Sequence, residues 1–100
     1  MMHHDLVPEE HLLTGNMVGE GSAMTGDIVE MRIRWLVAHR LQTVARSADG
    51  WDWLFRDPGD ARLWELTFPH GSLHGSGARR LAVITHADAD RKYPERLPAL

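Results

Sequence analysis

Five carboxylates lie in one stretch of 20 residues, from Asp49 to Phe68, which reads DGWDWLFRDPGDARLWELTF. Carboxylate pairs carry out general acid and base catalysis, for example in glycoside hydrolysis. Such a pair needs a cleft that shifts the pKa of one member, and a domain of 100 residues offers little room for one. Asp49, Asp57 and Asp60 also stand where turns favour aspartate. We therefore expect no catalytic residue in this stretch.

Histidines are the second group that could do chemistry. His70 and His74 stand in an H-x3-H pattern, which binds zinc when both side chains lie on one helical turn. Gly71 and Gly75 disfavour a helix there, the chain has no cysteine, and two further ligands are not evident. GSLHG and GSG are weak matches to a serine nucleophile elbow and a dinucleotide loop. We expect no metal and no cofactor.

The charges suggest which partner the chain binds. The net charge is −3 and it is segregated: residues 1–31 hold six acids and no Lys or Arg, whereas residues 32–46 hold four arginines and no acid. A nucleic-acid binder usually has a basic excess, so nucleic acid is not the expected ligand. An acidic surface suits a basic protein partner.

The sequence also bears on location. The first 30 residues contain neither a Lys or Arg nor a long apolar run, so we expect no signal peptide. Nor does any stretch approach 18 apolar residues, which predicts no membrane contact and a cytoplasmic location.

The first half of the chain predicts an arm, a small hairpin and a helix. Residues 1–10 are expected to form a flexible acidic arm, and residues 11–100 a single domain. Glycine spacing predicts short strands at Asn16–Val18 and Ser22–Met24. Residues 27–46 read as one helix, with Asp27 and Glu30 in a capping-box pattern and SADG ending it.

The second half predicts a hairpin, a further strand and a short helix. Apolar residues alternate from Trp51 to Phe55 and from Trp64 to Phe68, on either side of the turn sequence DPGDA. RRLAVIT predicts a more central strand, and Thr85 caps a short helix. The fold class is therefore α+β: a single two-layer domain with a long helix on an antiparallel sheet of three to five strands, and a short C-terminal helix.

Alternation along the hairpin assigns its side chains to two faces. It places Trp51 and Trp64 on the buried face, and Asp52 and Glu65 on the opposite one. The tryptophans are thus expected in the core, and the acids at a surface.

Particular motifs in this stretch resemble a known family. DGW at Asp49–Trp51, RDP at Arg56–Pro58 and WELT at Trp64–Thr67, within a pattern covering Arg32 to Tyr93, are similar to the immunity protein 27 family of bacterial polymorphic toxin systems. The chain departs from the pattern in DAR, where the family tends to have DGR, and in GSGAR, where it tends to have glycines and then prolines. The resemblance implies a small antitoxin, not an enzyme, that binds and neutralises a cognate toxin domain. Nucleases are common among such toxins.

Partner binding is expected at the acidic surface of the hairpin, together with the neighbouring loop. The residues predicted to bind the toxin are Asp52, Asp57, Asp60, Glu65 and His74. The alternative is a non-catalytic structural or homodimeric module that associates through Met31, Trp35 and Ala38. A third interpretation, a metal- or phosphate-dependent enzyme, has less support from the residues.

Overall fold

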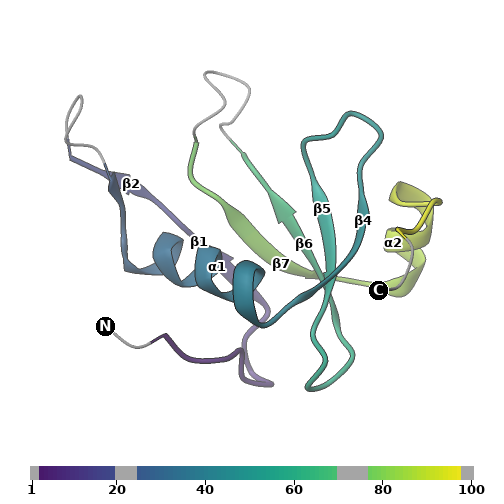
Figure 1. Cartoon of the computed structure of the whole chain (residues 1–100), viewed down its shortest axis with the longest axis horizontal. Coiled ribbons are helices and arrows are strands. Elements are labelled where there is room, and N and C mark those ends of the chain that lie inside the picture. Colours follow the sequence, from purple (N-terminus) through teal and green to yellow (C-terminus); the bar gives the residue numbers. More distant parts are fainter. Residues whose placement is uncertain (1–2, 20–24, 70–76, 98–100) are drawn as a thin grey trace.

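The structure, a computed structural model, describes residues 3–19, 25–69 and 77–97. A five-stranded antiparallel sheet has the order β1-β7-β6-β5-β4, and β2 and β3 form a separate two-stranded ribbon (Figure 1). The elements are β1 (Leu12–Thr14), β2 (Met17–Val18), β3 (Thr25–Gly26), α1 (Ile28–His39), β4 (Gln42–Arg46), β5 (Trp53–Arg56), β6 (Leu63–Thr67), β7 (Arg80–Ile84) and α2 (His86–Lys92). The predicted α+β class, with a long helix on an antiparallel sheet and a short C-terminal helix, is confirmed.

The two helices cover opposite faces of the sheet. On one face Phe55 and Trp64 are cross-strand partners, and they share a buried cluster with Ile33 and Leu36 of α1. On the other face Leu54 lies opposite Glu65, and it packs in a second cluster with Ala89 and Tyr93, at and just beyond α2. Burial of these side chains is the main force that holds the helices to the sheet.

Helix α1 starts where the sequence predicts but ends earlier. The Asp27 carboxylate accepts a hydrogen bond from the backbone N–H of Glu30 at 2.8 Å, as an N-cap does. The predicted extension to Arg46 is wrong. The N–H groups of Arg40 and Leu41 both donate to the carbonyl of Leu36, which closes the helix.

The residues after this point form strand β4 instead of further helix. Gln42–Arg46, which includes the β-branched Thr43 and Val44, pairs with β5. The hydrogen bonds and packing of this β4–β5 hairpin outweigh the helical propensity of the segment.

The prediction that Trp51 lies on the buried face of the sheet is wrong. The bond from Ser47 N–H to the carbonyl of Asp52 closes a turn, so pairing with β4 begins only at Trp53. Trp51 therefore lies in the turn and is 51% exposed, whereas Trp64 is 0% exposed. Glu65 does face away from Trp64, as alternation requires.

The predicted second short strand, Ser22–Met24, lies outside the described residues. Met17–Val18 pairs with Thr25–Gly26, which directly precedes the cap of α1.

Substituting the tryptophans one at a time tests this assignment. Trp64→Ala should lower the free energy of unfolding by about 3–5 kcal/mol, because it empties part of the core. Trp51→Ala should change it by no more than about 0.5 kcal/mol, as exposed positions do. Chemical denaturation of both variants measures the difference, and equal losses would show that Trp51 is also a core residue.

Candidate functional site

The predicted binding residues fall at two separate places. Asp52 and Glu65 lie on the sheet face beside α2, and Asp57 and Asp60 lie at the tip of the β5–β6 hairpin. His74 lies outside the described residues. The hairpin therefore presents two acidic surfaces.

The first acidic surface is neutralised from within the chain. Lys92 Nζ lies 2.7 Å from a carboxylate oxygen of Asp52 and 2.6 Å from one of Glu65. The Tyr93 hydroxyl donates to Glu65 at 2.7 Å. Burial works against the charge of Lys92, but the hydrogen bonds to both carboxylates outweigh it and raise the pKa of Lys92. These contacts hold the C-terminal helix to the sheet.

The second surface, at the hairpin tip, is formed by tight turns. Asp57 accepts a hydrogen bond from the N–H of Gly59 at 2.8 Å. Asp60 accepts from the backbone N–H and the guanidinium of Arg62. Desolvation by itself would raise the pKa of Asp60, but the hydrogen bonds from Arg62 outweigh it, so the pKa is lowered. Ala61 completes the tip with a φ of 67°. This left-handed conformation is unfavourable in free energy for any residue that has a Cβ atom.

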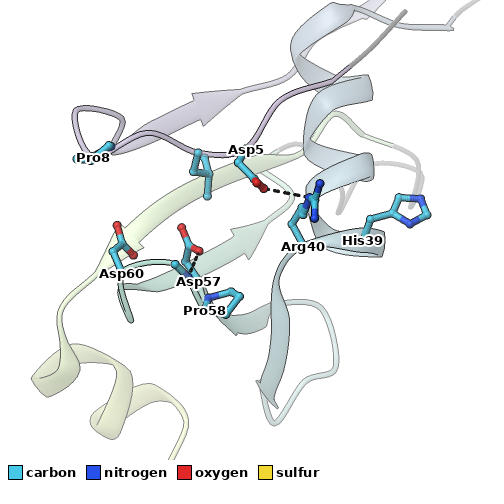
Figure 2. Close-up of a pocket in the computed structure, with 9 residues that line it drawn as sticks. Asp5, Pro8, His39, Arg40, Asp57, Pro58 and Asp60 are labelled. Carbon is cyan, nitrogen blue, oxygen red and sulfur yellow. Dashed lines mark hydrogen bonds and ion pairs between the residues drawn. The ribbon is translucent and has the colours of Figure 1, made fainter.

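A cleft of about 640 Å³ opens beside this tip (Figure 2). Three parts of the chain meet there: the N-terminal segment, the end of α1 and the tip itself. In Figure 2 the side chains of Asp57 and Asp60 point from the tip toward the N-terminal segment, and Asp5 reaches Arg40. The Asp5–Arg40 pair spans 3.2 Å, and both of its side chains are more than half exposed. The lining residues are Asp5, Leu6, Pro8, His39, Arg40, Asp57, Pro58, Gly59 and Asp60.

Two arginines fix the N-terminal wall of this cleft. Both oxygens of the Glu10 carboxylate accept from Arg32, at 2.6 and 2.8 Å, and the same guanidinium donates to the carbonyls of His4 and Asp5. Arg62 donates to the carbonyls of Val7 and Glu10. Hydrogen bonding to Arg32 lowers the pKa of Glu10 to about 2.

These contacts were not foreseen from the sequence, which predicts a flexible arm over residues 1–10. The one available signal is the charge segregation, since an acidic segment is followed by an arginine-rich one.

Within residues 3–19, 25–69 and 77–97, no three His, Cys, Asp or Glu side chains are grouped so as to hold a metal ion. None of the helices in that same part of the chain is both long and apolar enough to cross a bilayer.

The residues of the alternative homodimer lie on the outer side of α1. Met31 and Ala38 are exposed and Trp35 is half-buried. The Arg40 guanidinium lies 5.2 Å from the centre of the Trp35 ring, and the His39 ring is 6.1 Å away. Part of the indole is thus already covered within the chain.

Fold and surface together define a small α+β protein with an acidic cleft at the tip of a hairpin. The chain belongs to the immunity protein 27 family, whose family model matches residues 19–85. Members of this immunity family are typically non-catalytic and neutralise a cognate toxin of a polymorphic toxin system. Neither a curated protein nor a solved structure gives a significant match to the chain.

The match begins at residue 19, so it includes the hairpin tip but not the N-terminal wall of the cleft. That wall is therefore a feature of this chain that the family match does not account for.

Ala61 gives a test of the tip geometry. Its left-handed φ costs about 1–2 kcal/mol, whereas glycine adds about 0.4–1 kcal/mol of chain entropy to the unfolded state. Ala61→Gly, which restores the DGR that the family tends to have, should therefore raise the melting temperature by a few degrees.

Ala48→Gly is the matched control, because Ala48 is exposed in a turn and has no positive φ. It should lower the melting temperature through the entropy term alone. A lower melting temperature for Ala61→Gly as well would show that the tip is not strained.

Proposed function

We propose that this chain neutralises a toxin that is a nuclease, in the cytoplasm, by covering the basic surface with which the toxin binds its substrate. The observation that carries the proposal is the pair of carboxylates, Asp57 and Asp60, on the wall of the cleft at the hairpin tip. A surface that binds phosphates is basic, and acids that face it accelerate association and repel wrong partners.

The tip is the better candidate of the two acidic surfaces. Asp52 and Glu65 share the ammonium of Lys92, so a partner would have to displace or overcome that charge. Asp57 accepts a turn bond from an uncharged N–H through one of its oxygens. We therefore propose that Asp57 contacts the toxin and that Asp52 and Glu65 hold α2 in place. Asp60, which is itself paired with Arg62, adds negative charge beside Asp57. His74 lies outside the described residues and is kept as a proposed contact on the sequence alone.

The test requires the cognate toxin domain, which is sought among the genes adjacent to the one that encodes this chain. Purified toxin is assayed on DNA and on RNA with increasing amounts of the chain. We expect cleavage of one nucleic acid and complete inhibition near a one-to-one ratio. We also expect association to slow as salt is raised, because salt screens the charges that steer the two proteins together.

Each part of the proposal can fail separately. A toxin that cleaves neither nucleic acid but still kills cells, and is neutralised by the chain, would overturn the nuclease assignment alone. A nuclease that stays fully active at a large excess of the chain would overturn the neutralising role toward that toxin.

A further inference from the structure

The cleft beside the hairpin tip combines apolar walls with carboxylates. Leu6 and Pro8 come from the N-terminal segment and Pro58 from the tip. Asp5 and Asp57 lie among them. The long side chains of Lys and Arg have this same combination, an apolar stem and a charged head.

We propose that this cleft receives a single arginine or lysine side chain of the toxin, with its stem against Leu6, Pro8 and Pro58 and its cationic head between Asp5 and Asp57. The inference rests on the proposed neutralising function and adds to it the binding site and the chemical group that enters it.

The hydrogen bonds of the cleft leave acceptors for such a head group. Asp57 uses Oδ1 for the N–H of Gly59, and an ionised carboxylate offers about four lone-pair sites in all. The Asp5 carboxylate forms an exposed pair with Arg40, of a kind that is worth about 0.2–1 kcal/mol. Asp60 already has both oxygens on Arg62, so it contributes charge more than a new bond.

Charge favours a cation over an anion in this cleft. Among the described residues three carboxylates line it, against the guanidinium of Arg40 and the ring of His39. Arg62 offsets the charge of Asp60, which leaves Asp57 and the weakly paired Asp5 to attract a cation. Arg40 is engaged both with Asp5 and with the face of Trp35, so it is not directed at the cleft alone. An anion would meet Asp57 and Asp60 on the tip side.

The N-terminal wall is held in position before any partner arrives. The Arg32 side chain is only 12% exposed, and two of its nitrogens donate hydrogen bonds to the Glu10 carboxylate. Arg62 fixes the same segment through two carbonyls. Asp5 and Leu6 are thus held beside the tip, and a pre-organised site loses less free energy on binding.

The experiment compares isosteric variants that each remove one negative charge. Affinity for the cognate toxin domain is measured by calorimetry, and each variant is melted in parallel. Asp57→Asn retains an oxygen for the Gly59 N–H, so it should fold normally and bind about 30-fold or more weakly. In the part of the chain that the structure describes, the Asp5 side chain accepts no turn hydrogen bond, so Asp5→Asn should not disturb the fold. It provides the same test of binding if Asp57→Asn lowers the melting temperature.

Asp90→Asn is the matched control, because Asp90 lies on α2 and pairs with Arg96 at an exposed position. It changes the net charge by the same amount but should alter the affinity for the toxin less than about threefold, because an exposed ion pair contributes little free energy.

Removing the charge of Arg40 should strengthen toxin binding, whereas removing the charge of Asp57 or Asp5 should weaken it. Arg40→Gln frees Asp5 for the incoming cation and should tighten binding by up to about fivefold, the worth of an exposed pair. Arg96→Gln removes the same charge at the control site and should not tighten it.

Equal weakening by Asp57→Asn and Asp90→Asn, or unchanged binding in both Asp57→Asn and Asp5→Asn, would overturn the cleft as the site. Weaker binding in Arg40→Gln would do the same, since it would point to an anionic group. An unaltered chain that does not bind the toxin at all would overturn the proposed function, and this inference with it.

Discussion

The carboxylate of Glu30 joins parts of the chain that are far apart in sequence. It is completely buried, and an unpaired charge in such a place would cost several kcal/mol. Arg34 donates to it from the next turn of α1 at 2.6 Å, and Arg79, just before β7, donates through its backbone N–H at 2.6 Å and its guanidinium at 2.5 Å. A Cβ at Gly15 would lie 2.7 Å from a Glu30 oxygen, and one at Gly26 would lie 2.6 Å from its Cγ. The glycines therefore make room for the carboxylate, and the carboxylate fixes α1 over the sheet.

The position of α1 in turn sets the shape of the cleft. Because α1 is fixed at its start by Glu30 and its cap, its last turn delivers Arg40 to the hairpin tip. Arg32, midway along the helix, then holds the N-terminal segment through Glu10. The acidic cleft thus depends on ion pairs of graded burial: Glu30 at the centre, Glu10 partly covered, and Asp5 at the surface. The most exposed of these pairs, Asp5 with Arg40, lies in the cleft where we propose that the partner binds, so it can be exchanged for an intermolecular one.

Local patterns predicted the parts of the fold that depend on neighbours in sequence. The β5–β6 hairpin, the Asp27 and Thr85 caps and the burial of Trp64 all follow from alternation or capping chemistry. The end of α1 and the exposure of Trp51 could not be predicted from such patterns, because both depend on where β4 pairs with β5. The cleft could not be predicted for a different reason, because it depends on contacts between distant segments: Arg62 donates to the carbonyl of Glu10, 52 residues away in sequence. The i,i+4 spacing of Glu30 and Arg34 does predict their ion pair, which forms. The capping box predicts the Asp27 cap but not the contact of the Glu30 side chain with Arg79.

The most direct test of the central claim, that the toxin binds at the cleft between the N-terminal segment and the hairpin tip, is amide hydrogen exchange. The chain is compared alone and in complex with an inactivated toxin domain. We expect new protection at Leu6, Arg40, Gly59 and Asp60, with exchange in α2 unchanged. Protection confined to α2, or to the outer face of α1 around Met31, would contradict it.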